Sequence, residues 1–301
     1  MDSVRAWCGV MNYRYEFIGD EFFVICGEDY LARVGDNKRS ITNLARLELT
    51  RTRLAEGWDQ VIWLDADTFI FDPNRFELAL TDGYAFAREV WVAEKADGWL
   101  RADVGVHNAA IVFRGHHPDL DLLIHTIRHI VATRLIHSNY QVGTKLLLGL
   151  QYSLDFKVVA QAAMFSPDMV RAIAQPSTLQ SRRILALHAK EYRFRVYAAN
   201  LCWSMKDELD PDAVMRAMDI LESTRGDVVN DHLTAAQKAG PAQILATEPA
   251  IWLPATPREQ HHGSLAWRAK QAAARLVDHI LPNGVTRALR RALILVNRAS
   301  G

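Results

Sequence analysis

Two carboxylates, Asp65 and Asp67, follow a short apolar run and are the residues of this chain best suited to chemistry. The run at 61–64 has the continuous apolar character of a central strand buried in a sheet. Side chains that follow such a strand lie at the edge where α/β sheets place their ligands. Carboxylate oxygens suit hard divalent cations, which also bind substrate phosphates. The pattern therefore predicts a Mn²⁺ or Mg²⁺ site that could stabilise a diphosphate leaving group.

The elements that must position these carboxylates follow from the spacing of apolar residues. Helical spacing predicts helices over 39–56 and 119–135. Alternating or continuous apolar runs predict strands, which we place at 13–17, 61–64, 68–71, 108–113 and 184–187. Strands that alternate with helices favour an α/β domain with a mainly parallel sheet covered by helices on both faces. We place this domain at 1–210 and a helical extension at 211–301.

The composition limits the partners and the compartment. The chain has 301 residues, and its 35 basic and 35 acidic residues cancel. A zero net charge argues against nucleic acid as a partner, because nucleic-acid-binding domains are usually basic. The cysteines Cys8, Cys26 and Cys202 form no paired framework, which favours a reducing compartment. No apolar run reaches the roughly 18 residues of a membrane span, and no signal peptide is evident, so we predict a cytoplasmic protein.

The residues around the two carboxylates resemble a known family. The segments 44–47, 57–68 and 71–73 look like the metal-binding region of GT-A glycosyltransferases, and they are most similar to the retaining hexosyltransferases of families 8 and 34. The segment 107–114 resembles that family's Asn-Ser-Gly strand, with Ala109 and Ala110 in place of Ser and Gly. The resemblance implies a GT-A, Rossmann-like fold and transfer of a hexose from a nucleotide diphosphosugar, with retention of configuration. UDP-hexose is the first expected donor and GDP-mannose the second; the acceptor would be a saccharide or a lipid-linked molecule.

The resemblance also implies roles for individual residues. Asp67 would be the principal metal ligand, Asp65 a second ligand or a ribose contact, and His188, at the end of the strand 184–187, the third ligand. The substrate-binding residues would be Arg46 for the nucleotide sugar or the Asp-x-Asp loop, Asp103 and Asn108 for sugar hydroxyls, and Lys190 for a phosphate. Gln141, under the anomeric carbon, would be a catalytic residue together with Asp65 and Asp67. Ordinary surface or turn roles remain open for Arg46, Lys190 and Asp103.

Two other functions fit parts of the sequence. The run 61–68 also matches the first motif of haloacid-dehalogenase-type phosphatases, in which the first Asp is a nucleophile. The segment 226–231 fits that family's late metal-binding pattern, but it follows a polar stretch rather than an apolar strand. A non-catalytic sugar-nucleotide-binding module on the same fold is the other alternative.

The two ends of the chain carry separate expectations. Basic amphipathic helices are predicted at 265–281 and 285–296, and such helices often lie in a lipid interface. We therefore expect peripheral contact with the inner face of a membrane, with packing on the catalytic domain as the alternative. If 13–17 is the second strand of the sheet, no apolar run before Ser3 can form the first. We expect that strand to lie upstream in the natural protein or to be replaced by another segment, such as one after Pro241.

Overall fold

The computed structural model describes residues 2–115, 117–133, 139–151, 153–154, 156–205 and 208–239. Its helices are α1 (Asp2–Met11), α2 (Glu28–Val34), α3 (Lys38–Ala55), α4 (Pro118–Thr133), α5 (Thr144–Leu150), α6 (Pro167–Ala174), α7 (Leu179–Tyr192), α8 (Pro211–Ser223), α9 (Asp227–Asn230) and α10 (Ala235–Ala239). Short 3-10 helices are η1 (Asp20–Val24), η2 (Asn139–Val142) and η3 (Trp203–Met205). The strands are β1 (Gln60–Leu64), β2 (Thr68–Ile70), β3 (Tyr84–Glu94), β4 (Leu100–Arg114), β5 (Lys157–Val159), β6 (Ala162–Met164) and β7 (Ala198–Asn200).

The strands form two mixed sheets flanked by helices, which confirms the predicted α/β class. One sheet has the order β1-β4-β3-β5 and the other the order β2-β7-β6. Within the described residues, three strand pairings are antiparallel and two are parallel, so the prediction of a mainly parallel sheet is wrong. The apolar pattern of a strand reports how it is buried, and it does not report the direction of its partner.

Strand β1 lies at an edge of its sheet and not at the centre that its apolar run predicted. Its apolar character has another cause, because both of its faces are covered. Val61 and Trp63 pack against the core formed with α3 and α4, whereas Ile62 and Leu64 pack against a second core that contains residues of α1. Burial of both faces requires apolar residues at successive positions, whether the strand is central or not.

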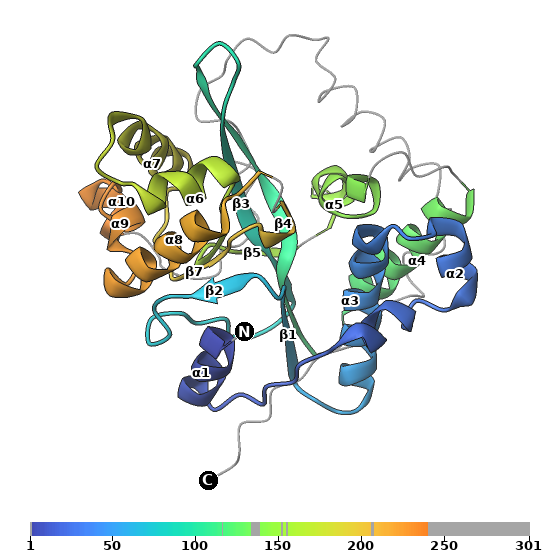
Figure 1. Ribbon diagram of the computed structural model, residues 1–301. Helices are drawn as coiled ribbons and strands as arrows, with labels where there is room; N and C mark the ends of the chain where they lie inside the picture. Colours follow the sequence, from blue (N-terminus) through green and yellow to red (C-terminus); the bar gives the residue numbers. More distant parts are fainter. Residues whose placement is uncertain are drawn as a thin grey trace.

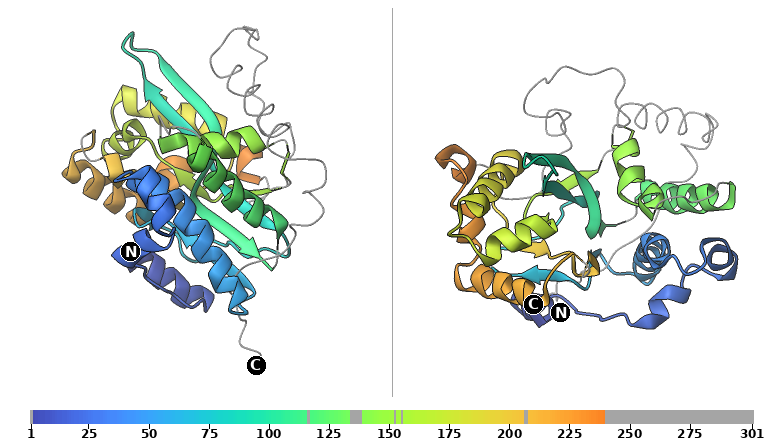
Figure 2. Two further views of the ribbon diagram at one scale, coloured as in Figure 1. Left: turned by 90° about the vertical axis from the view of Figure 1, so that its right-hand side faces the viewer. Right: turned by 45° about the horizontal axis from the view of Figure 1, so that its top comes forward.

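Helices cover the first sheet from two sides (Figure 1). The views in Figure 2 show α2, α3 and α4 on one side and α6 and α7 on the other. Aromatic residues of β3 and β4, such as Phe86 and Phe113, belong to the core under α3 and α4. Val90 and Val92 of β3 belong to the core with α6, α7 and α8. Strand β3 therefore connects both halves of the molecule.

The long hairpin of β3 and β4 changes register near its middle. Phe86 pairs with Ile111, but the next residue, Ala87, pairs with His107. Three residues of β4, at 108–110, therefore have no partner in β3. Such bulges re-aim side chains and are common beside active sites. Here the bulge turns the β4 backbone toward α3 and toward the end of β1, because the Ala109 carbonyl accepts a hydrogen bond from the Asp65 amide at 2.8 Å.

Five of the seven predicted helices and strands are confirmed. The elements α3, α4, β1 and β2 lie at 39–56, 119–135, 61–64 and 68–71 to within a few residues, and 108–113 is the second half of β4. The strand at 13–17 is wrong, since this segment has no regular structure. Its aromatic residues pack individually instead; Tyr13 meets the Trp7 ring edge to face, and Tyr15 lies under Arg5. The expectation of a first strand upstream of Ser3 stays a prediction.

The strand predicted at 184–187 is also wrong, because this segment is the middle of helix α7. Thr178 caps the helix by accepting a hydrogen bond from the Ser181 amide. The buried residues Ile184, Leu185 and His188 then follow helical spacing. The four apolar residues at 184–187 belong to a partly buried helix. A run of only four apolar residues fits a helix as well as a strand, so the sequence pattern alone could not decide between them.

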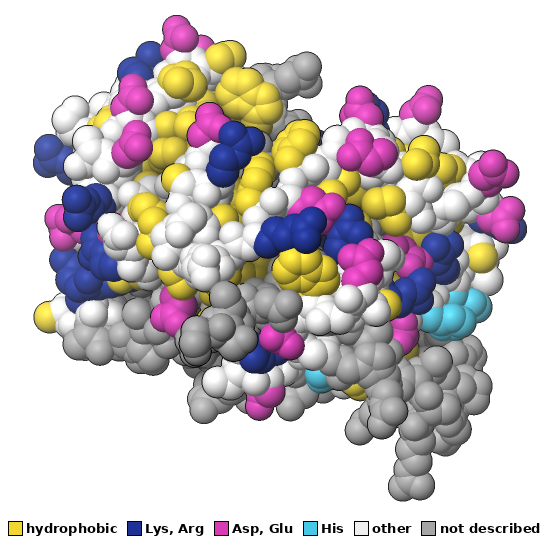
Figure 3. Space-filling model, turned by 90° about the horizontal axis from the view of Figure 1, so that it is seen from below, with side chains coloured by type: hydrophobic (Ala, Val, Ile, Leu, Met, Phe, Trp, Pro, Cys, Tyr) yellow, Lys and Arg dark blue, Asp and Glu magenta, His cyan; other side chains and the backbone are white. Residues whose placement is uncertain are grey.

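The described residues after 210, at 211–239, pack on the first part of the chain. Helix α8 lies against α6, and its residues Val214 and Ala217 are buried in the same core as α6 and α7. The boundary at 210 stays a prediction, and the predicted helices at 265–281 and 285–296 lie outside the described residues. None of the described helices combines the length and the apolarity that crossing a membrane requires. On the face in Figure 3, charged side chains of both signs are interspersed with hydrophobic ones.

Candidate functional site

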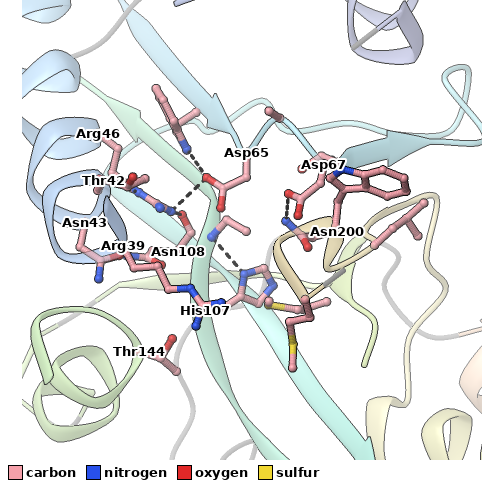
Figure 4. A pocket seen from close by; sticks show the side chains of 18 of the residues that line it. Arg39, Thr42, Asn43, Arg46, Asp65, Asp67, His107, Asn108, Thr144 and Asn200 are labelled. Atoms are coloured by element: carbon pink, nitrogen blue, oxygen red, sulfur yellow. Dashed lines mark hydrogen bonds and ion pairs between the residues drawn. The ribbon is translucent and has the colours of Figure 1, made fainter. Parts of the chain in front are cut away.

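A cavity of about 1080 Å³ opens between α3, the end of β1, the β3–β4 hairpin and α8. Its volume lies at or above the usual range of about 300–1,000 Å³ for small-molecule sites. Its lining combines polar side chains, which include those labelled in Figure 4 and are called the polar wall here, with apolar side chains that include three methionines. The polar lining includes Arg39, Thr42, Asn43, Arg46, Asp65, Asp67, Glu89, Asp103, His107, Asn108, Lys145 and Asn200; the apolar lining includes Trp91, Leu148, Met164, Leu201, Trp203, Met205, Val214 and Met218.

Asp65 lies in the polar wall and is held by two donors. Its Oδ1 accepts a hydrogen bond from Trp63 Nε1 at 2.6 Å and lies 3.2 Å from Arg46 Nη1. Burial raises the pKa of Asp65 to about 6; Arg46 opposes this shift, Asp67 adds to it, and the Trp63 bond opposes it. Both contacts use Oδ1, so Asp65 Oδ2 remains available to a cation or a hydroxyl. Asp65 thus lines the cavity, and its role as a ligand stays a prediction.

Asp67 is held by the second sheet. Its Oδ1 accepts a hydrogen bond from Asn200 Nδ2, and its carbonyl accepts one from the Leu201 amide at 3.0 Å. Asn200 stands at the end of β7 because β2 pairs with β7 and places Thr68 opposite Asn200. The turn from Asp65 to Thr68 thus aims two carboxylates at one cavity from two different sheets.

Arg46 reaches this site from the middle of α3 and is buried, not on the surface. Its Nη1 contacts Asp65 and also donates a hydrogen bond to the Asn108 carbonyl on the β4 bulge. Its Nε donates to the Thr42 carbonyl at 3.1 Å. Burial lowers the pKa of Arg46, whereas Asp65 and Asp67 raise it. Arg46 therefore joins α3, β4 and the Asp-x-Asp turn.

Asn108 and Asp103 also line the cavity, as their predicted roles require. The Asn108 side chain donates from Nδ2 to Asn43 Oδ1 at 3.0 Å. Asp103 is exposed and pairs with Arg101 on its own strand. Both residues lie on β4, on either side of Gly105, where the hairpin forms the floor of the cavity.

Three predicted residues are not brought to the cavity. His188 lies in α7 and is buried between the rings of Phe165 and Tyr192, at centroid distances of 5.4 and 4.9 Å. The strand that was to place it beside Asp65 does not exist, so the geometric basis for a metal ligand there is wrong. Lys190, also on α7, is exposed and lies 3.6 Å from Glu191. Gln141 lies in η2, outside the residues that line the cavity.

Two cavity groups were missed by the sequence analysis. His107 is buried on β4, and its Nδ1 accepts a hydrogen bond from the Ala109 amide at 3.0 Å. Burial, together with Arg46, lowers the pKa of His107 to about 3 against an opposing effect of the Arg88 carbonyl. Glu89 lies on β3, and burial raises its pKa to about 7, with Asp103 adding to the shift. The available signal for Glu89 was a charged pair, Arg88-Glu89, inside the apolar run 84–92.

Comparison with protein-family models, with curated proteins and with solved structures finds no match. The site is therefore interpreted from its own residues.

The donor set at Asp65 and Asp67 fits a divalent cation that is bound together with a substrate. Among the described residues, no group of three or more His, Cys, Asp or Glu side chains could hold a metal ion. Mg²⁺ and similar cations are nevertheless often held by one or two carboxylates plus substrate phosphates, rather than by a complete protein cage. Asp67 and Oδ2 of Asp65 would supply such a partial set, with the remaining positions left to water and a diphosphate.

The two sequence motifs of the phosphatase alternative, at 61–68 and 226–231, do not line the same cavity. Its late acidic pattern falls on α9 and the residues beside it, where Asp227 and Asp231 lie outside the residues that line the cavity. Asn230 is buried there, and its Oδ1 accepts a hydrogen bond from the Val196 amide at 3.0 Å, which is a structural role. Asp231 pairs with Lys238 at 2.9 Å. The geometry thus favours the reading of Asp65 and Asp67 as ligands.

Proposed function

We propose that this chain is a metal-dependent glycosyltransferase that moves a hexose from a nucleotide diphosphosugar to an acceptor. The observation that carries the proposal is the pair Asp65 and Asp67 on the polar wall of a cavity large enough for two substrates. The mixed α/β fold is compatible with a GT-A, Rossmann-like architecture, which is part of the proposal. UDP-hexose is the first candidate donor and GDP-mannose the second.

In this proposal Asp67, with Asp65, holds Mn²⁺ or Mg²⁺, which when bound neutralises charge on the leaving diphosphate. The chain's own residues bind and orient the donor. Arg46 keeps Asp65 ionised and fixes the Asp-x-Asp turn against the β4 bulge. Arg39 lies on the same wall and supplies a positive charge for a phosphate oxygen. Asn108 offers an amide that can hydrogen-bond a sugar hydroxyl.

The apolar part of the lining suits an apolar or flat part of a substrate. Trp203 and the methionines Met164, Met205 and Met218 line it, and methionine adapts to ligands of different shape. The acceptor in this proposal is a saccharide or a lipid-linked saccharide, in keeping with the proposed site at the inner face of a membrane.

The proposal is tested by thermal shift and calorimetry with UDP, GDP, UDP-glucose, UDP-galactose and GDP-mannose, each with and without Mn²⁺. We expect one nucleotide class to bind in a Mn²⁺-dependent manner and to stabilise the fold by about 2.7 kcal/mol at a hundredfold excess over its Kd. Asp67→Asn keeps an oxygen for Asn200 but removes the charge, and we expect it to weaken this binding by about 100-fold, because a charge-assisted contact is worth several kcal/mol.

Lys190→Ala is the matched control, since it removes a charge on α7 outside the cavity. It should bind nucleotide and Mn²⁺ as the unmodified protein does. Equal nucleotide affinity of Asp67→Asn and the unmodified protein, or no Mn²⁺-dependent binding of any nucleotide tested, would contradict the proposed function.

A further inference from the structure

The floor of the cavity carries a carboxyl group that the metal site does not use. Glu89 lines the cavity from β3 and is partly buried. It has no hydrogen-bond or ion-pair partner among the described residues, although its carboxyl group is largely removed from solvent. A buried carboxylate without a partner is costly, so such groups in clefts are candidates for function.

The neighbouring strand leaves this carboxyl accessible. Glu89 pairs with Gly105 of β4, and a Cβ atom at Gly105 would lie 3.6 Å from Glu89 Oε2 and 3.2 Å from Leu148 Cδ2. The Glu89 carboxyl group therefore lies next to Gly105, which has no side chain, and near the apolar Leu148. Directly opposite residues of paired strands share a face, which places Glu89, Gly105, Trp91 and Asp103 together on the cavity floor.

Glu89 lines the same cavity as Asp65 and Asp67. The thiol of Cys202, which follows β7, is buried, and both Asp67 and Glu89 raise its pKa in addition to burial. The two carboxylates therefore lie within electrostatic range of the same buried atom. A donor bound at Asp65 and Asp67 and an acceptor bound over Glu89 would therefore occupy one cavity.

We propose that Glu89 is the catalytic base that takes the proton from the acceptor hydroxyl, and that the acceptor is a saccharide held on the floor formed by Glu89, Trp91 and Asp103. This proposal rests on the proposed function. The Trp91 ring offers a flat apolar surface for one face of a sugar ring, and Asp103 can accept hydrogen bonds from other hydroxyls.

The reaction step balances without a further reactant. The hydroxyl proton moves to the Glu89 carboxylate while the hydroxyl oxygen forms a bond to the anomeric carbon. The bond from that carbon to the diphosphate oxygen breaks, and the oxygen keeps the electron pair. Glu89 then returns the proton to water, so the products are the glycoside, the nucleoside diphosphate and one proton. A single displacement of this kind inverts the anomeric configuration, in contrast to the retention that the resemblance implies.

Asp103 and His107 are less suited to this role. Asp103 is exposed and forms an ion pair with Arg101, so it is already compensated. His107 is buried and uses Nδ1 as an acceptor for a backbone amide. The charged and titratable groups around Glu89 are Asp103 and His107 of β4, Cys202 after β7, and Lys145 of α5, which lines the same cavity.

The test compares Glu89→Gln, Glu89→Asp and a matched control, Glu94→Gln. Glu94 lies on the same strand, is exposed, and is outside the cavity. UDP-glucose, UDP-galactose and GDP-mannose serve as donors with Mn²⁺, and water, glucose, galactose and lactose as acceptors. Release of nucleoside diphosphate is followed from pH 5 to 9, and the anomeric configuration of the product is read by proton NMR.

We expect Glu89→Gln to bind nucleotide and Mn²⁺ normally but to release product at least about 100-fold more slowly, as for loss of a general base. Its rate should also lose the acidic limb of the pH profile. Glu89→Asp should restore part of the rate, Glu94→Gln should match the unmodified protein, and the product should have the opposite anomeric configuration to the donor.

A Glu89→Gln variant with more than a third of the rate and an unchanged acidic limb would overturn the assignment of Glu89. A product with retained configuration would overturn it as well. These outcomes differ from failure of the proposed function itself, which would appear as Mn²⁺-independent nucleotide binding, as equal binding by Asp67→Asn, or as no product release by the unmodified protein with any of the donors.

Discussion

Strand β3 carries two adjacent charged residues, Arg88 and Glu89, which differ in the partners that the protein provides for them. Arg88 is buried against α7, where Nε donates to the Tyr192 carbonyl at 3.1 Å and Nη2 to the Glu191 carbonyl at 3.0 Å. The rings of Tyr192 and Phe194 lie 5.7 and 5.8 Å from its guanidinium carbon. Glu89 points to the opposite face, as successive strand residues do, and has no such partners. Backbone carbonyls satisfy two of the three guanidinium nitrogens of Arg88, and only Nη1 is buried without a partner among the described residues. Arg88 is therefore largely built into the structure, whereas the unpartnered Glu89 carboxyl group faces a cavity and is a candidate for binding a ligand.

The largest expected effect concerns Arg88. Arg88→Ala removes two hydrogen bonds to backbone carbonyls and the packing of a long side chain, and it leaves those carbonyls buried. We expect a loss of about 3 kcal/mol in the free energy of unfolding, measured by urea denaturation. Glu89→Ala removes no hydrogen-bond partner and relieves the burial of a carboxyl group, so the free energy of unfolding at pH 7 should stay the same or rise. Equal losses for the two variants would break the comparison.

The second prediction concerns pH. The pKa of Glu89 is raised from its usual range to about 7 in the folded protein, mainly by burial. Between about pH 4.5 and 7 the folded protein holds this proton and the unfolded chain does not, so stability falls as pH rises through this window. The side chain of Gln in Glu89→Gln does not ionise, so the variant lacks this pH dependence. Its stability relative to the unmodified protein should therefore grow by about 1–3 kcal/mol from pH 5 to pH 8.

The measurement is urea denaturation at both pH values, with Glu94→Gln as the control on the same strand. A relative stability of Glu89→Gln that is the same at pH 5 and pH 8 would show that Glu89 titrates normally and would remove the contrast with Arg88.

The smallest expected effect concerns His188, which lies in the same core as Arg88. Neither of its ring nitrogens has a hydrogen-bond partner among the described residues. Its pKa is lowered to about 3 by burial and by Arg88. His188→Leu gives up no hydrogen bond and should raise the free energy of unfolding by about 1 kcal/mol at pH 7.

The gain from His188→Leu should increase as the pH falls from 7 to 5, because the unfolded chain of the unmodified protein then protonates this histidine while the folded protein does not. Mn²⁺-dependent nucleotide binding should be unchanged. Weaker Mn²⁺ binding by His188→Leu, measured by electron paramagnetic resonance, would instead restore His188 as a ligand.

Much of the site was predictable because its residues follow local rules. Asp65 and Asp67 end an apolar strand, and α3 has an amphipathic pattern that places Arg46 near the same strand. The structure brings Arg46, Asp103 and Asn108 to one cavity with these carboxylates. Each of these expectations needed only the pattern within one element and a resemblance in a short block of sequence.

The misses have two physical origins, which are long-range pairing and the local ambiguity of a short apolar run. The direction of the partner of β1 and the bulge at 108–110 are set by contacts between β1, β3 and β4, which no single segment encodes. At 184–187 an apolar run of four residues fits a strand or a helix equally, and the cap at Thr178 decided it. Glu89 was missed because its lack of a partner becomes visible only when the cavity around it is known.

The Asp-x-Asp turn joins two sheets that share no backbone ladder in the described part of the chain. Asp65 is bonded through its amide to β4 of the first sheet, and Asp67 through its carbonyl and side chain to the end of β7 in the second. The separation of the two carboxylates therefore varies with any sliding of one sheet past the other. A cation bound by both carboxylates would therefore link the two sheets. When it binds, the protection of β2 and β7 amides from hydrogen exchange would rise together with that of β1.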